Sequence, residues 1–100
     1  MSLISECSFV YQPIVTPEKA IIGYEVLTRH SKLTPQHVIS KIEKEHLVPQ
    51  HIISMLGHIQ SRIPKTIPVF INITPKVLLE KGTRALMKNF SETHPIILET

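Results

Sequence analysis

The sequence predicts an α/β protein whose strands form a mostly parallel sheet and alternate with helices. One observation is the run of β-branched and aromatic residues at 69–73, which is typical of a strand covered on both faces in a parallel sheet. Another is the pair Thr-Pro at 34–35 and again at 74–75, which marks the beginning of a helix. The expected order along the chain is β-β-α-α-β-α-β, with the first strand running antiparallel to the others.

The first two strands are expected at residues 9–15 and 20–28. An alternating pattern that contains Val, Tyr and Ile begins at Phe9, and Thr16 and Pro17 interrupt it. The apolar pattern resumes at Ala20. These two segments therefore predict a pair of strands joined by a short turn.

Two helices are expected next. The first begins at Thr34 and Pro35, because the threonine hydroxyl can accept from free N–H groups of the first turn, and it extends to about residue 47. The second opens at Pro49 and has an apolar face with helical spacing. We expect the residues of this face to lie in the core: Ile52, Leu56, Ile59 and Ile63.

The last third of the chain is expected to form a strand, a helical segment and another strand. The strand at 69–73 leads directly into Thr74 and Pro75, and helical turns at 77–79 and 85–90 are separated by Gly82. A strand at 95–100 follows, and it would lie at an unfinished edge of the sheet.

The composition is that of a globular chain with a core. Of 100 residues, 42% are hydrophobic and 19% are charged. The net charge of +3 is scattered, and no basic stripe is interleaved with aromatic residues, so we expect neither DNA nor RNA as a partner. No long apolar run and no export signal are present, and Cys7 is the single cysteine. We therefore expect no membrane segment and a cytoplasmic setting.

Three polar side chains on successive strands could meet on one face of the sheet. Alternate side chains of a strand share a face, so Asn72 points away from the aliphatic side of its strand. The same alternation places Glu25 on that face of the second strand and Glu99 on that face of the last. Oxygen donors grouped in this way suit Mg²⁺ or Mn²⁺. An acid that is ion-paired or lies at a solvated strand end is the more common situation, so the pattern leaves both interpretations open.

A series of short motifs covers nearly the whole chain. It begins with Tyr-Gln-Pro-Ile-Val at 11–15 and Gly-Tyr-Glu-Val-Leu-Thr-Arg at 23–29, followed by the helical segment 38–48. Phe-Ile-Asn-Ile-Thr-Pro at 70–75 and Ile-Leu-Glu at 97–99 complete it. In this order the motifs resemble the start of an EAL domain, a cyclic di-GMP phosphodiesterase family. Residues 25–27, Glu-Val-Leu, stand for the Glu-Ala-Leu that names the family.

The resemblance implies roles for five residues. Glu25, Asn72 and Glu99 would be metal ligands for Mg²⁺ or Mn²⁺, Gln12 would contact a guanine of cyclic di-GMP, and Arg29 would contact a phosphate. An Arg fork suits a phosphodiester, and the metals would activate a water and polarise the scissile phosphate.

The resemblance also implies a TIM-like (β/α) barrel, which needs about 250 residues. Residues 1–100 would then form the N-terminal portion of a single EAL-type domain, an incomplete barrel without the later catalytic residues of the family. We therefore expect the 100-residue chain alone not to hydrolyse cyclic di-GMP. An open half barrel would expose apolar surface and a strand edge, so we also expect self-association.

Two other functions stay open at this point. The chain could be a non-catalytic EAL-like binding or regulatory module, or an unrelated small α/β domain. Single residues have simpler interpretations too: Gln12 as an ordinary strand residue, and Arg29 as an ion-pair partner of Glu25. The six histidines form no His-x-x-x-His pair, so surface placement is favoured for them over metal ligation. Cys7 has no evident activating partner, so no nucleophilic role is expected for it.

Overall fold

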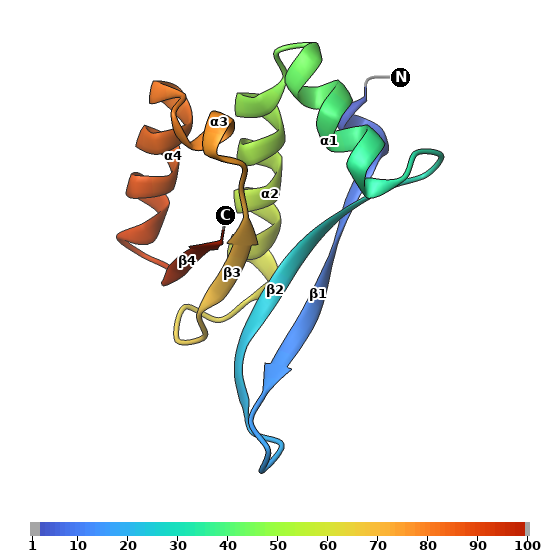
Figure 1. Ribbon diagram of the computed structural model, residues 1–100. Helices are drawn as coiled ribbons and strands as arrows, with labels where there is room; N and C mark the ends of the chain where they lie inside the picture. Colours follow the sequence, from blue (N-terminus) through green and yellow to red (C-terminus); the bar gives the residue numbers. More distant parts are fainter. Residues whose placement is uncertain (1–2, 100) are drawn as a thin grey trace.

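The computed structural model describes residues 3–99 of the chain, without the side chain of Lys81 (Figure 1). A short 3₁₀ turn, η1, at Ile4–Glu6 precedes the first strand. The strands are β1 (Cys7–Val15), β2 (Ile21–His30), β3 (Val69–Asn72) and β4 (Ile96–Glu99). The helices are α1 (Pro35–Lys44), α2 (Val48–Arg62), α3 (Pro75–Leu78) and α4 (Lys81–Ser91).

The four strands form one sheet in which spatial order repeats chain order, β1-β2-β3-β4. β1 pairs antiparallel with β2, whereas β2, β3 and β4 run parallel to one another, as the sequence predicted. The β1–β2 hairpin extends well beyond the two shorter strands (Figure 1). The sheet and helices confirm the predicted α/β fold class.

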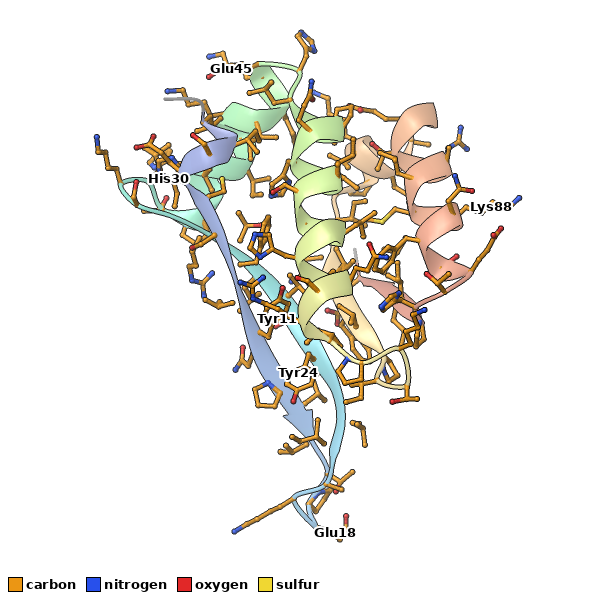
Figure 2. All side chains as sticks on the ribbon, turned by 180° about the vertical axis from the view of Figure 1, so that it is seen from behind. Tyr11, Glu18, Tyr24, His30, Glu45 and Lys88 are labelled. Atoms are coloured by element: carbon orange, nitrogen blue, oxygen red, sulfur yellow. The ribbon has the colours of Figure 1, made fainter. Side chains whose placement is uncertain are left out.

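The helices lie on one face of the sheet, with α2 between α1 and α4 (Figures 1 and 2). Val69 and Ile71 on β3 are fully buried on that face, and the predicted apolar face of α2 packs there as well. Ile52, Leu56, Ile59 and Ile63 are all buried, which confirms their assignment to the core. Burial of these side chains fixes which residues of β2, β3 and β4 point to the opposite face.

Both threonine–proline pairs begin helices as predicted. The Thr34 hydroxyl accepts from the backbone N–H of His37 at 3.3 Å, and the Thr74 hydroxyl accepts from the N–H of Val77 at 3.2 Å. In each helix the proline occupies the first turn, where its missing N–H costs no hydrogen bond. The second cap turns the chain sharply at the carboxyl end of β3.

The helical segment after β3 differs from the prediction, because it consists of two helices. The break lies at Leu79 and Glu80, where Glu80 has an extended backbone, and Gly82 lies inside the first turn of α4. A glycine is tolerated there because first-turn N–H groups have no partner within the helix. The interruption lets α4 pack against α2, which buries Thr83 and Met87.

Surface placement proved wrong for three histidines. His51 on α2 and His94 before β4 are 5% and 1% exposed, and the side chain of His30 at the end of β2 is 3% exposed. His51 Nε2 lies 3.1 Å from the hydroxyl of Thr28, which gives this buried ring a polar partner. His94 stacks on Phe90 with ring centroids 4.6 Å apart, and its Nδ1 lies 3.2 Å from the hydroxyl of Thr93, whereas its Nε2 is buried without a hydrogen-bond partner among the described residues.

No helix within residues 3–99 is both long and apolar enough to span a bilayer.

Candidate functional site

The five residues singled out in the sequence belong to one face of the sheet. Gln12 on β1 lies directly opposite Glu25 on β2, and Asn72 on β3 lies directly opposite Glu99 on β4. Residues directly opposite each other share a face. Arg29 lies four positions after Glu25 on β2 and therefore has the same orientation. This face is the one that the helices leave open.

Glu25 and Asn72 are in contact across two neighbouring strands. The side-chain amide of Asn72 donates to Oε2 of Glu25 at 3.4 Å, although the two residues are 47 positions apart in the sequence. Asn72 ends β3, where the chain turns into α3, so its side chain lies at the carboxyl edge of the sheet. Parallel pairing of β2 and β3 brings the two side chains together.

Glu99 adds a second carboxyl group at the same place. Partial burial raises the pKa of Glu99, and the neighbouring Glu25 raises it further through a hydrogen bond and through charge repulsion. One oxygen of Glu99, Oε1, is buried without a hydrogen-bond partner. Two adjacent carboxyl groups, one with an unsatisfied buried oxygen, either share a proton or take up a cation.

The donor set fits a hard divalent cation. Glu25, Asn72 and Glu99 present carboxylate and amide oxygens, which Mg²⁺ and Mn²⁺ prefer, and no sulfur or imidazole takes part. Among residues 3–99, no three His, Cys, Asp or Glu side chains converge elsewhere to offer a competing metal site. The amide of Asn72 is therefore needed to complete a group of three at this position.

Arg29 and Gln12 are exposed on the same face. The Arg29 guanidinium donates through Nη1 to the carbonyl of Thr28 at 3.1 Å. It makes no ion pair with Glu25, although both residues are within the described chain, so the simpler interpretation of Arg29 as a structural partner of Glu25 was wrong. The guanidinium keeps most of its donors free for an anion.

A cavity of about 400 Å³ opens beside these residues. Arg29, Asn72 and Glu99 line its polar side, and apolar residues of β2, α1 and α2, among them Val26, Ile42 and Ile52, line its interior. A concave apolar site with a few convergent polar groups is typical of small-molecule binding.

One link at the site was missed in the sequence. Thr74 donates through its hydroxyl to Oε1 of Glu43 on α1 at 3.3 Å, and both residues line the cavity. The bond joins α1 to the turn just after Asn72. The threonine was recognisable as a helix cap, but its second partner lies 31 positions away, and no local pattern indicates such a distance.

One solved structure is similar to almost the whole chain. It is described as "PaMucR Phosphodiesterase, c-di-GMP complex", and it aligns with a TM-score of 0.61 over 96% of this chain. The sequence identity is 20%, so the similarity establishes the fold. This chain spans about half of that one, 46% of its length. The observed α/β arrangement therefore corresponds to about half of that larger fold.

The other two comparisons found nothing. No family model matches the sequence, and no curated protein matches it.

Proposed function

We propose that this chain forms the N-terminal portion of an EAL-type, metal-dependent cyclic di-GMP phosphodiesterase domain. One observation carries the proposal: Glu25 lies within hydrogen-bond distance of Asn72, and Glu99 joins them at the same edge of the sheet. The motif order in the sequence and the similar fold of a phosphodiesterase solved with c-di-GMP support it.

In this proposal Glu25, Asn72 and Glu99 hold Mg²⁺ or Mn²⁺. A bound ion would supply a Lewis acid for the scissile phosphodiester. It would also neutralise the adjacent carboxylates and satisfy the buried Oε1 of Glu99. Cyclic di-GMP would lie along the open face, where Arg29 donates to a phosphate and Gln12 contacts a guanine.

We expect the 100 residues alone to bind without turnover. The similar phosphodiesterase is about twice as long, and the face that carries Glu25 is uncovered by any element within the described residues. Chemistry on a phosphodiester needs groups on both sides of the reacting phosphorus, and this face supplies one side. We also propose a reducing compartment such as the cytoplasm, because the sequence contains a single cysteine.

Metal binding tests the proposal directly. Mn²⁺ titrations followed by electron paramagnetic resonance would compare the wild type with Glu25→Gln and Glu99→Gln, which remove charge and keep shape. Each variant is expected to weaken Mn²⁺ binding by roughly tenfold or more, since even outer-shell changes cost that much. Glu18→Gln, at the distant tip of the hairpin (Figure 2), is the matched control and should bind as the wild type does.

Turnover distinguishes the two functional alternatives. Cyclic di-GMP would be incubated with Mn²⁺ and the protein, both as the mass-verified 100 residues and within any longer parent chain, and linear product would be measured. Hydrolysis by the parent that Glu25→Gln abolishes supports the phosphodiesterase. Binding of cyclic di-GMP with no hydrolysis in either form supports a regulatory module instead. Equal Mn²⁺ affinity in the wild type and Glu25→Gln would refute the metal site.

A further inference from the structure

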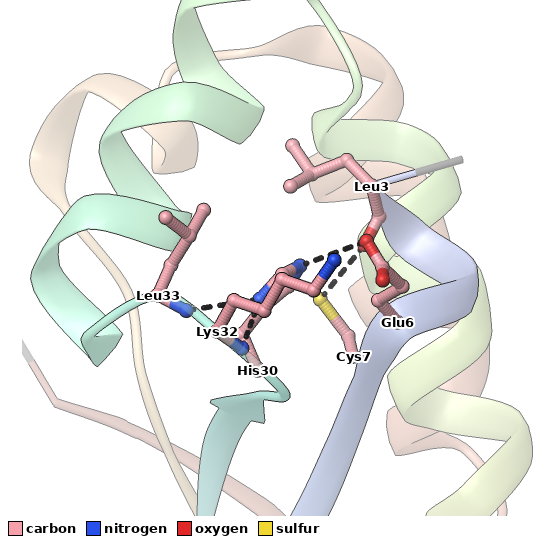
Figure 3. A network of polar contacts seen from close by, with 6 residues as sticks. All are labelled: Leu3, Glu6, Cys7, His30, Lys32 and Leu33. Atoms are coloured by element: carbon pink, nitrogen blue, oxygen red, sulfur yellow. Dashed lines mark hydrogen bonds and ion pairs between the residues drawn. The ribbon is translucent and has the colours of Figure 1, made fainter. Parts of the chain in front are cut away.

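A buried imidazole lies immediately after Arg29, at the end of β2. The side chain of His30 is 3% exposed, and its Nδ1 accepts two backbone hydrogen bonds, from Lys32 and Leu33, each at 3.1 Å (Figure 3). Backbone N–H groups can only donate, so Nδ1 must present its lone pair. His30 in this arrangement is therefore the neutral ring with its proton on Nε2.

The other ring nitrogen faces a carboxylate. Nε2 of His30 lies 3.6 Å from Oε2 of Glu6, in the 3₁₀ turn before β1, and it has no closer partner. Glu6 therefore favours a proton on Nε2, which leaves Nδ1 free to accept. The thiol of Cys7, directly opposite His30 in the sheet, donates to the carbonyl of Leu3 at 3.4 Å, and burial and Glu6 raise the pKa of this thiol. The groups that face the ring are thus Glu6 from η1, Cys7 from β1 and the exposed Lys32 from the turn.

The two bonds to Nδ1 shape the connection between β2 and α1. Residues 31–34 carry the chain from the strand to the helix, and Thr34 then caps α1. The N–H groups of Lys32 and Leu33 have the imidazole as their acceptor, and Leu33 packs against the core. Arg29 directly precedes His30 and pairs with Ser8 of β1, so the end of β2 is held by the neighbouring strand on one side and by this turn after it.

We propose that His30 is a positioning residue for Arg29, with Glu6 fixing its tautomer. This inference rests on the proposed phosphodiester contact of Arg29. The neutral imidazole holds the turn closed and thereby steadies the end of β2, where Arg29 lines the cavity together with Asn72 and Glu99. A donor in place of the Nδ1 acceptor would face two N–H groups, so a side chain that presents a donor there should open the turn and weaken phosphodiester binding.

Two amide variants separate the functions of the two ring nitrogens. Asparagine places its oxygen near the position of Nδ1, whereas glutamine places its amide nitrogen near Nε2. Cyclic di-GMP affinity would be measured by calorimetry on the full chain at pH 8. His30→Asn should bind within about twofold of the wild type, and His30→Gln should bind about tenfold more weakly, the cost of one misdirected bond to a charged group.

Two further readouts exclude a merely structural role. Mn²⁺ affinity should be equal in both His30 variants, because the proposed ligands lie on other residues. In an Arg29→Ala background, His30→Gln should cause no further loss, since its effect acts through Arg29. Additive effects of Arg29→Ala and His30→Gln, or equal affinities of the two His30 variants, would overturn the proposal.

The proposal can be judged even if the chain binds no cyclic di-GMP. Failure of the wild type to bind would count against the proposed function alone. The Arg29 Nε–H signal in ¹H–¹⁵N NMR spectra and amide exchange of Lys32 and Leu33 would then decide. A shifted Arg29 signal and faster exchange in His30→Gln, with wild-type behaviour in His30→Asn, support the positioning role. Unchanged signals in both variants refute it.

Discussion

His51 is a buried base whose burial should appear in the pH dependence of stability. Desolvation lowers the pKa of His51 from 6.5 to about 4. The unfolded chain therefore takes up a proton more readily than the folded one between these values, and folding is destabilised as the pH falls through this window. Above about pH 7 the effect is absent, because the ring is neutral in both states.

We expect His51→Gln to remove most of this pH dependence. For the wild type, the contribution should approach roughly 3 kcal/mol of lost unfolding free energy at pH 4. Urea unfolding at pH 8, 6 and 4 would measure it, and the pH 8 value reports lost packing alone. If the unfolding free energy of His51→Gln fell toward pH 4 as steeply as that of the wild type, other groups would be the cause of the pH dependence.

Gly23 lies beneath an aromatic ring on the open face of the sheet. A Cβ at this position would lie 2.8 Å from Cε1 of Phe70 and 3.1 Å from the carbonyl oxygen of Pro68. We expect Gly23→Ala to cost about 1–3 kcal/mol in unfolding free energy, the usual cost of overpacking.

Phe70→Leu offers the rescue for this substitution. The smaller side chain removes the closest contact, so the double variant should lose less stability than the sum of the two single changes. Thermal unfolding of the wild type, the two single variants and the double variant would measure this difference in stability. Additive losses would mean that the clash is with the backbone of Pro68.

Residue alternation along strands is local, and this is why the site could be anticipated. The faces of Glu25, Asn72 and Glu99 follow from a two-residue repeat that needs no knowledge of distant contacts. The burial of His51 could not be anticipated, because its hydroxyl partner Thr28 is 23 positions away. Nothing in the sequence around the histidine distinguishes it from an exposed one.

Helix boundaries were predictable where a side chain caps the helix, and α1 shows this best. Thr34→Ala should cost about 1 kcal/mol, since the N–H of His37 loses its acceptor. Thr34→Ser keeps the hydroxyl and serves as the matched control in urea unfolding. Equal losses for alanine and serine would assign the effect to the threonine methyl group.

The boundary between α3 and α4 shows the opposite case. Local preference favours a break at Gly82, yet the break lies at Leu79 and Glu80. Burial of Thr83 and Met87 at the interface of α4 with α2 sets where the second helix begins. Tertiary packing outweighs the roughly 1 kcal/mol preference against a helical glycine, especially within a first turn.

The whole molecule presents an open edge, and we propose that it self-associates there. Within residues 3–99 β4 pairs only with β3, and Ile97 on its open face is 42% exposed. Unpaired edges and exposed apolar residues favour association.

Light scattering over a range of concentrations should therefore report species larger than a monomer. Ile97→Lys should shift the distribution toward the monomer, whereas Leu79→Lys, at a more exposed position after α3, should not. A monodisperse monomer at every concentration would contradict the proposal.

Strand order and fold class were accessible from the sequence, because each element has its own local pattern and parallel strands need helical connections. The cavity of about 400 Å³ could not be predicted from the sequence, because it arises where α1, α2 and the sheet do not fill the space between them. Residual volume of this kind depends on the packing of side chains from several segments that are far apart in the sequence.

A sheet whose neighbours in space are also neighbours along the chain can be assembled during synthesis. Each strand after β1 can pair with the strand made just before it. No strand has to be inserted between two strands that have already paired. Glu25 is made early and remains without a second acid beside it until β4 docks with Glu99. The electrostatic cost of bringing the two acids together is thereby postponed until β1, β2 and β3 are already paired and can resist it.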